Sequence, residues 1–376
     1  METQKVIISK HLEQSLASAI DECRADRLVV LTDETTQRLC WPVVSGYACL
    51  QDAAHIVIKA GDEHKTLNTL SYVWQELQRL GATRHSLLLN LGGGMVTDLG
   101  GFAASTFKRG MHLINVPTTL LSMVDASVGG KTGINFGGLK NELGVFRNAS
   151  AVILDTTFLQ TLDHENILSG YAEMLKHGLI TSIQPTGGQT MLGELLSFDL
   201  DRPDLVQLAR MVAYSVKVKQ RVVLNDPTEQ GLRKALNLGH TVGHAFEAFS
   251  LSYGSTQDTQ EAGDDSLNHK KRDIRPVLHG YAVAWGLVCE LYLSVVKTGF
   301  PVDVMRQVVR FVVDHYGRMP ITCDDYPTLL ELMTHDKKNT GNEINFTLLG
   351  GVGDIRINQT ATRQEIEEAL DFYREG

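Results

Sequence analysis

Positive charge is scarce in this sequence. Its 35 lysines and arginines are outnumbered by 44 aspartates and glutamates, which gives a net charge of −9. A general nucleic-acid-binding protein needs a basic surface to neutralise phosphates, so we do not expect this class of protein or a nucleic-acid partner. The deficit still allows a local basic pocket that binds a small anion.

Cysteine is also scarce, and its pattern excludes a disulfide framework. The five cysteines are an odd number and form no C-x-x-C pair. This dispersal is typical of reduced thiols in a cytosolic protein. The residues are Cys23, Cys40, Cys49, Cys289 and Cys323.

Long hydrophobic runs are absent. The opening METQKVIISK lacks the apolar core of a signal peptide. The most apolar stretch, 282–296, contains Glu290 and is too short to span a bilayer. We therefore expect a cytoplasmic protein without a membrane span, and we interpret this stretch as a buried helix.

The length of 376 residues suits two domains rather than one core. Residues 1–160 alternate short β-branched runs with amphipathic stretches such as 66–80, a pattern that predicts a Rossmann-like α/β domain with a mostly parallel sheet. The expected strands are 6–9, 27–33, 55–61, 86–93, 112–119 and 151–156.

Residues 161–376 change to long helical periods and predict a mostly helical, essentially all-α second domain. A polar stretch without apolar periodicity, 255–275, is interpreted as a loop, and a short strand pair is expected near 345–358. The expected helices are 163–182, 203–224, 231–250, 278–298 and 302–316.

A glycine-rich segment, LGGGMVTDLGGFAA (91–104), follows an apolar strand. Glycines let the backbone approach a ligand closely, and a helix starting near Val96 would point its N–H groups and positive dipole end at the loop. This geometry suits a pyrophosphate, although a plain strand-to-helix turn has the same composition. Asp33 at the end of one strand, and Thr118 and Thr119 after another, favour a dinucleotide site at the carboxyl edge of the sheet.

Histidines in LNLGHTVGHAFEAF (236–249) indicate a metal site. His240 and His244 are four residues apart and share one helix face. His279 opens the next helix, and Glu173 lies on an earlier one. Two histidines, one carboxylate and an open fourth position form a catalytic zinc pattern. Spacing alone leaves open which histidines bind the metal. His177, at i+4 from Glu173, is a further candidate. His269 lies in the polar loop and is expected to be solvated.

Cationic and amide side chains recur beside these motifs in an otherwise acidic chain. Lysines in glycine-rich turns hold phosphates or carboxylates as flexible point charges. Taken singly, each is as well explained as a surface charge. The set comprises Arg109, Lys131, Lys140, Asn141, Lys176, Lys219, Arg233, Lys337 and Lys338.

Seven motifs in a fixed order resemble the 3-dehydroquinate synthase family of sugar-phosphate cyclases, over nearly the whole chain from about Asp33 to Gly341. Their joint occurrence is far more specific than any one of them. They are GGGMVTDLGGFAASTFKRG, VPTTLLSMVDASVGGKTGIN, LKNELG, AEMLKHG, RKALNLGHTVGHAFE, VLHGYAVAWG and HDKKNTG.

The resemblance implies a dehydroquinate synthase-like fold, a phosphate lyase activity and a place in the shikimate pathway of aromatic amino acid biosynthesis. The substrate it implies is a phosphorylated sugar acid, 3-deoxy-D-arabino-heptulosonate 7-phosphate, which becomes 3-dehydroquinate and phosphate. NAD transiently oxidises a ring hydroxyl, phosphate leaves by β-elimination, the ketone is reduced again, and an aldol step closes the carbocycle. A homodimer is also implied.

Site residues follow from the same resemblance. Glu173, His240 and His279 would bind zinc or cobalt, which leaves His244 as a substrate contact and proton carrier. Asp125, Lys131, Asn141 and His244 would be catalytic. The substrate-binding residues would be Arg109, Lys131, Lys140, Asn141, Lys176, Lys219, Arg233, Asn237, His244, Lys337 and Lys338. The NAD-binding residues would be Asp33, Asp62, Lys65, Gly93, Gly94, Asp98, Thr118, Thr119, Lys131 and Lys140.

The chain departs from the family pattern at four places. Thr35 stands where asparagine is frequent, Asp62 where glutamate is usual, and Tyr281 where glutamate is common; the 255–275 loop is longer than is typical. These departures affect the expected NAD contacts and the rim of the site, not the ligand triad.

The sequence is also compatible with three other functions. Another sugar-phosphate cyclase would differ around the substrate carboxylate, and Asn237 and His244 favour the dehydroquinate reaction over it. A metal-dependent polyol dehydrogenase would release NADH and would not need so many phosphate-site cations. A catalytically silent protein on the same fold is disfavoured by the intact triad.

Overall fold

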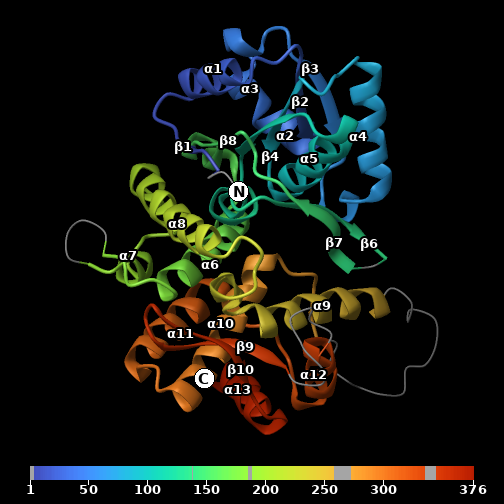
Figure 1. The fold of residues 1–376 in the computed structure, drawn as a ribbon. Coiled ribbons are helices and arrows are strands. Elements are labelled where there is room, and N and C mark those ends of the chain that lie inside the picture. Colours follow the sequence, from blue (N-terminus) through green and yellow to red (C-terminus); the bar gives the residue numbers. More distant parts are fainter. Residues whose placement is uncertain (1–3, 138, 185–188, 258–271, 335–343) are drawn as a thin grey trace. The chain divides into compact units, whose positions relative to one another are not determined.

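The computed structural model describes residues 4–137, 139–184, 189–257, 272–334 and 344–376 (Figure 1). It divides into two compact units. Unit 1 comprises Met1–Gly170 and Asp201–Leu224, and unit 2 comprises Tyr171–Leu200 and Asn225–Gly376.

Unit 1 is built on a six-stranded parallel sheet with the order β1-β8-β5-β4-β2-β3. The central strands β2 and β4 are almost wholly buried, which explains their near-continuous apolar sequences. All six expected strands are present, with ends shifted by a few residues. The strands are β1 (Val6–Ile8), β2 (Leu28–Asp33), β3 (Ala54–Ile58), β4 (Leu87–Gly92), β5 (His112–Pro117) and β8 (Ala151–Leu154).

The strand order reverses between β2 and β4. From β2 the chain adds β3 on one side, then returns to add β4 and β5 on the other. In open α/β sheets, ligands bind at the carboxyl ends of strands where the order reverses. Asp33 ends β2 and the glycine-rich loop follows β4, so both expected dinucleotide elements lie at this point.

The helices of unit 1 connect and cover these strands. The helix at 205–224, expected within the second domain, belongs to unit 1, because its Gln220 donates a hydrogen bond to Gln4 and its Lys219 pairs with Asp125. The helices are α1 (Leu12–Cys23), α2 (Glu34–Leu39), α3 (Trp41–Val44), α4 (Leu67–Arg79), α5 (Gly94–Thr106) and α8 (Leu205–Asn225), whose last residue lies past the unit boundary.

The glycine-rich segment after residue 127 forms a hairpin, although its composition is more typical of turns and loops. Its antiparallel strands are β6 (Lys131–Phe136) and β7 (Leu139–Phe146), visible below the sheet of unit 1 in Figure 1. Glycine is needed within the strands because a Cβ on Gly144 would lie 2.1 Å from the carbonyl oxygen of Thr132. The composition that suggested a loop therefore reflects close approach of two backbones.

Unit 2 is mostly helical and contains the expected strand pair as an antiparallel hairpin, β9 (Asn345–Gly351) and β10 (Asp354–Thr360). α6 (His164–Leu179) crosses from unit 1 into unit 2 at residue 170. The other helices are α7 (Met191–Leu196), α9 (His240–Gln257), α10 (His279–Thr298), α11 (Val302–Tyr316), α12 (Tyr326–Thr334) and α13 (Arg363–Glu375).

The helix expected over 231–250 is divided in two. A 3-10 turn over Leu232–Asn237 is followed by Gly239, whose φ of 79° is left-handed, and α9 begins only at His240. The left-handed residue breaks the helical path, because an α-helix requires negative φ throughout.

α10 passes the length and composition test for a membrane-spanning helix, but 72% of its most apolar stretch is buried. Core helices of globular proteins pass the same test. Residues along nearly the whole of α10 pack inside unit 2, as expected for a buried helix.

Candidate functional site

Glu173, His240 and His279 converge in unit 2. They come from α6 and from the first residues of α9 and α10. One ligand atom from each lies within 4.8 Å of the others. Nε2 of His240 is 3.4 Å from Oε1 of Glu173, and Nε2 of His279 is 3.5 Å from the same oxygen.

Both imidazoles are oriented through their other nitrogen. Nδ1 of His240 lies 3.1 Å from the carbonyl oxygen of Leu238, and Nδ1 of His279 lies 3.2 Å from Oε2 of Glu247. A carbonyl and a carboxylate can only accept, so each Nδ1 is the donor. This directs both Nε2 atoms at Glu173, the arrangement that metal-binding histidines commonly adopt.

Glu173 is completely buried. Lys176 forms an ion pair with its Oε2. Within the described part of the chain, neither carboxylate oxygen accepts a hydrogen bond of normal length and geometry. A buried carboxylate whose oxygens accept no such hydrogen bond is suited to hold a cation between it and the two imidazoles.

The charges of the three groups are strongly coupled. Burial, followed by the charge of Lys176, lowers the pKa of His240 to about 3. For His279, burial alone would lower the pKa, but the nearby carboxylates of Glu173 and Glu247 outweigh it and raise the pKa to about 10. Burial would raise the pKa of Glu173, yet Lys176 and His240 hold it well below the usual range. At neutral pH, Glu173 is ionised and His240 is neutral, as ligands must be, whereas His279 is protonated and would release its Nε2 proton on binding a metal.

This geometry selects among the candidate histidines. His244 is exposed, and its ring centre lies 5.3 Å from that of His240 and 5.9 Å from that of His279. It stands beside the triad without sharing the convergent position. His177 is fully buried in α6, and one of its ring nitrogens lies within 4.8 Å of a carboxylate oxygen of Glu173, so it stays a candidate ligand. Two imidazoles and one carboxylate fit a tetrahedral metal with one position open.

Arg233 and Asn237 lie in the 3-10 turn that leads to His240. Arg233 is buried and donates from Nη1 to the carbonyl oxygen of Pro227 at 2.7 Å. Asn237 donates from Nδ2 to Oε1 of Glu229 at 3.1 Å. With Lys176 beside Glu173, these residues place cationic and amide groups close to the triad in sequence and, for Lys176, in space.

In unit 1, the glycine-rich loop lies where a dinucleotide would need it. Gly93 is the N-cap of α5, and Gly94 begins the helix. A Cβ on Gly93 would lie 3.1 Å from Cγ2 of Thr119, and Thr118 donates its backbone N–H to Gly92 at 3.0 Å. The loop and the two threonines are therefore neighbours at the carboxyl ends of β4 and β5.

Asp33 has a structural partner as well as its expected role. Its Oδ1 accepts a hydrogen bond from the backbone N–H of Thr36 at 2.7 Å and caps α2. The other predicted NAD residue near this edge, Asp62, is exposed; its Oδ2 lies 3.6 Å from Nζ of Lys140 and 3.2 Å from Nδ2 of Asn135.

Lys65 joins two further predicted residues. Its buried ammonium donates to Oδ2 of Asp98 and to Oδ1 of Asn141, both at 2.5 Å. Burial raises the pKa of Asp98, and Lys65 opposes that effect. Asn141 has a left-handed φ of 52°, and its N–H is held by Oδ1 of Asn135 at 3.0 Å. The hairpin thus carries Asn141 to the helix that follows the glycine-rich loop.

Asp125 and Lys219 form a second polar pair in unit 1. Asp125 lies on a π-helical turn, Ser122–Ala126, a conformation that is frequent at functional sites. Nζ of Lys219, which is buried, lies 2.6 Å from Oδ1 of Asp125. Sequence reasoning gave both residues separate roles and did not predict that they pair.

The remaining predicted cations are exposed or outside the described residues. Lys131 begins β6 with an exposed side chain, and Arg109 lies in an exposed turn with a φ of 67°. Lys337, Lys338 and His269 fall outside the described residues.

Glu247 and Asn135 were not predicted from sequence. Glu247 lies seven residues after His240, on the same face of α9, and this spacing could have identified it. Asn135 had no comparable signal, because its role depends on the unpredicted hairpin.

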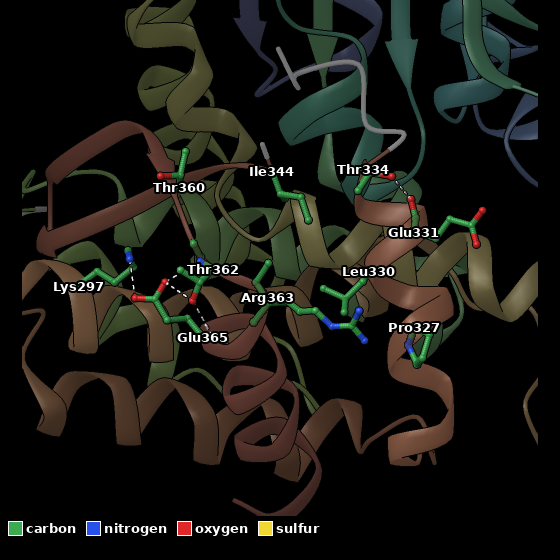
Figure 2. Close-up of a pocket in the computed structure, with 12 residues that line it drawn as sticks. Lys297, Pro327, Leu330, Glu331, Thr334, Ile344, Thr360, Thr362, Arg363 and Glu365 are labelled. Carbon is green, nitrogen blue, oxygen red and sulfur yellow. Dashed lines mark hydrogen bonds and ion pairs between the residues drawn. The ribbon is translucent and has the colours of Figure 1, made fainter. Parts of the chain in front are cut away.

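A surface pocket of about 560 Å³ lies elsewhere in unit 2, between the ends of α10 and α12 and the start of α13 (Figure 2). Three of its charged side chains form ion pairs within the protein. Nζ of Lys297 lies 2.6 Å from Oε1 of Glu365, as Figure 2 shows, and Arg363 pairs with Glu367 at 2.8 Å. None of the predicted site residues that the structure describes lines this pocket.

Comparison with known proteins identifies the family of this chain. A profile described as 3-dehydroquinate synthase N-terminal matches residues 55–169, and one described as 3-dehydroquinate synthase C-terminal matches residues 170–256 and 269–339. A 3-dehydroquinate synthase from Parabacteroides distasonis is 49% identical over 376 residues, covering 100% of this chain and 99% of the relative.

Solved structures of sugar-phosphate cyclases share the fold. A 2-epi-5-epi-valiolone synthase from Streptomyces hygroscopicus, with NAD+ and Zn2+ bound, has a TM-score of 0.77 and 25% identity, covering 100% of this chain and 98% of that one. A 2-deoxy-scyllo-inosose synthase, complexed with carbaglucose-6-phosphate, NAD+ and Co2+, has a TM-score of 0.78 and 21% identity, covering 99% and 96%. The family profiles and the full-length relative agree with the motifs: this chain belongs to the 3-dehydroquinate synthase family.

Proposed function

We propose that this chain converts 3-deoxy-D-arabino-heptulosonate 7-phosphate to 3-dehydroquinate and phosphate as an NAD- and zinc-dependent phosphate lyase. The observation that carries the proposal is the convergence of Glu173, His240 and His279, with both Nδ1 atoms fixed by acceptors. A silent protein would have no need for a buried carboxylate that faces two oriented imidazoles.

Zinc is the metal we propose at this triad, with cobalt as its substitute. Two imidazoles and a carboxylate leave a fourth position for substrate oxygens. When bound, the metal would act as a Lewis acid on a substrate hydroxyl. The valiolone synthase that shares this fold was solved with Zn2+, and the inosose synthase with Co2+.

NAD is proposed to bind at the carboxyl edge of the unit 1 sheet. Gly93 and Gly94 would admit its pyrophosphate to the start of α5, where backbone N–H groups and the helix dipole favour an anion. When bound, NAD would accept a hydride and return it within one turnover. Other NAD contacts are proposed for Asp33, Asp62, Lys65, Asp98, Thr118 and Thr119, with Lys131 and Lys140 shared with the substrate.

The substrate carries a phosphate and a carboxylate, and the chain offers cations for both. Lys131, Lys140 and Arg109 from unit 1 would hold anionic groups as charged donors. Unit 2 would contribute Lys176, Arg233 and Asn237. Asn141 and Lys219 complete the described part of the proposed set, and Lys337 and Lys338 are proposed from the family motif alone.

Proton transfer is proposed for exposed His244, which stands beside the triad. Imidazole is a common proton carrier in proteins, because its ordinary pKa lies near neutral pH. Asp125, held by Lys219, would orient the reacting part of the substrate. The substrate phosphate would accept a proton as it leaves.

Product identification tests the proposal against its rivals. Purified protein with Zn2+ and NAD is incubated with the heptulosonate phosphate, and the product is followed by proton NMR. The signals of 3-dehydroquinate are expected. An unchanged substrate spectrum, together with turnover of another sugar phosphate, would assign the chain to a different cyclase reaction. NADH accumulation with a polyol would instead indicate a dehydrogenase.

Two further features are proposed from the family alone. We expect a homodimer and a cytoplasmic location. Sedimentation velocity of the purified protein tests the oligomeric state. A dimer of two 41.5 kDa chains should have a mass of about 83 kDa. Cell fractionation tests the second.

A further inference from the structure

Glu290 lies in the middle of α10 and is completely buried. A carboxylate in such a place is costly unless hydrogen bonds replace its water. Glu290 meets this need with three backbone donors. Oε2 accepts from Gly239 at 2.6 Å, and Oε1 accepts from Thr241 at 3.0 Å and Val242 at 3.3 Å.

These donors belong to the start of α9. The first N–H groups of a helix lack partners within the helix, and the positive dipole end favours an anion. The residue before His240 is glycine, which has no side chain to cap the helix. Glu290 therefore supplies the cap of α9 from the neighbouring helix.

The two helices touch closely enough to make this cap rigid. A Cβ on Gly286 of α10 would lie 2.0 Å from the carbonyl oxygen of Gly239 and 2.7 Å from the nitrogen of Gly243. Only glycine allows such an approach of backbone to backbone. Since His240 begins α9 and His279 begins α10, this contact also sets the separation of the two imidazoles.

One peptide group links Glu290 to the metal ligand. The N–H of Gly239, which donates to Glu290, and the carbonyl of Leu238, which accepts from Nδ1 of His240 at 3.1 Å, are two ends of the same peptide. A peptide is planar, so holding its N–H fixes the direction of its carbonyl. That carbonyl keeps the proton of His240 on Nδ1 and leaves Nε2 facing Glu173.

We propose that Glu290 is a positioning residue for the metal site: it holds the 238–239 peptide and the first turn of α9 so that His240 presents Nε2 to the metal. This role rests on the proposed metal site at Glu173, His240 and His279. Under this proposal, buried Glu290 contributes to metal affinity although it is not itself a metal ligand.

The test compares metal binding in folded variants, with Co2+ as the probe. Glu290→Gln keeps the shape but turns an amide donor toward backbone donors. Glu290→Met removes the polar atoms at similar volume and leaves the three backbone donors without their acceptor, so circular dichroism is used to show that this variant is folded. Each is expected to bind Co2+ about 10-fold or more weakly in chelator competition, as for other residues that orient metal ligands, and to alter the visible cobalt spectrum.

Ser294→Ala is the matched control, one turn further along α10. Its hydroxyl donates to the carbonyl of Glu290 at 2.7 Å and accepts from Leu349 at 3.1 Å. It should lower the melting temperature without changing cobalt affinity or spectrum. A folded Glu290→Gln or Glu290→Met protein with native cobalt affinity and spectrum would overturn the proposal. If the wild type binds no Co2+, the metal site itself fails, and the role of Glu290 with it.

Discussion

Oε2 of Glu247 lies 3.2 Å from Nδ1 of His279, and Glu247 is not one of the three proposed metal ligands. The carboxylate fixes which nitrogen of the imidazole carries the proton. Glu247→Gln, which keeps the shape and removes the charge, is expected to weaken zinc binding by about 10-fold to 100-fold. Competition with a chromogenic chelator measures the change.

Glu331→Gln is the control for that experiment, because Glu331 is an exposed glutamate of unit 2 outside the triad. It should leave zinc affinity unchanged. Native zinc affinity in folded Glu247→Gln would mean that the carboxylate does not orient His279.

Removing a ligand should have a larger effect than removing its orienting partner. His279→Ala deletes one of three protein ligands, so we expect loss of bound zinc and of measurable phosphate release. Metal content by atomic emission and turnover by a phosphate assay are compared on the same preparation. Full turnover with metal still bound would show that His279 is not a ligand.

Lys131→Ala separates substrate binding from NAD binding. Lys131 is exposed at the start of β6, so its loss should not disturb the fold. Losing one charge-assisted phosphate contact should raise KM for the heptulosonate phosphate by about 10-fold to 100-fold, whereas NAD, which keeps its other proposed contacts, should lose much less affinity. Lys10→Ala, which changes another exposed lysine of unit 1, is the control. Equal losses of substrate and NAD affinity in Lys131→Ala would show that the hairpin does not bind the substrate specifically.

Gly93→Ala tests the glycine-rich loop as a pyrophosphate site. The φ of Gly93 is −73°, which alanine adopts without strain, and its Cβ would lie 3.1 Å from Cγ2 of Thr119. The methyl group should block close approach of the pyrophosphate and weaken NAD binding by at least about 10-fold. Calorimetric titration measures it beside Gly46→Ala, where a Cβ meets nothing within 4 Å. Equal NAD affinity in both variants would leave the loop as a simple turn.

Much of this architecture follows from the sequence because local patterns determine it. The six strands of the unit 1 sheet are short apolar runs, and α11 was predicted with its observed ends. The β6–β7 hairpin was missed because Gly133 and Gly144 break the usual strand composition, while the structure needs them for close strand contact. The helix break at Gly239 depends on the neighbouring α10, which no local pattern reports.

The residue types of the proposed metal site could be predicted from the sequence, but which histidines are the ligands could not. His240 and His244 share one helix face, so spacing cannot choose between them. The choice depends on where the N-terminus of α10 brings His279 and where α6 brings Glu173. The partners of the ligands, Glu247 and the Leu238 carbonyl, are likewise properties of the folded chain.

Asp325 provides a prediction about acid stability in unit 2. It accepts hydrogen bonds from Arg272 and from the N–H of Thr322 at 2.7 Å. Burial alone would raise the pKa of Asp325, but these bonds lower it. A lowered pKa contributes stability that is present above the unfolded value of about 4 and is lost as pH falls through the folded value.

Asp325→Asn should therefore destabilise the protein by about 2 kcal/mol at pH 7. The difference from wild type should shrink as pH falls below about 4. Urea unfolding at a series of pH values measures it, with exposed Asp324→Asn as the control. A difference that is the same at every pH would show that the charge of Asp325 is not the cause.

The central claim is that NAD is used and regenerated within a phosphate-eliminating reaction. The most direct measurement supplies purified protein with zinc, the heptulosonate phosphate and substoichiometric NAD, and follows released phosphate together with absorbance at about 340 nm. Many phosphates released per NAD, with no accumulation of NADH, is the result we predict. No phosphate release from protein shown to hold zinc and NAD, or one NADH formed for each substrate consumed, would contradict the account.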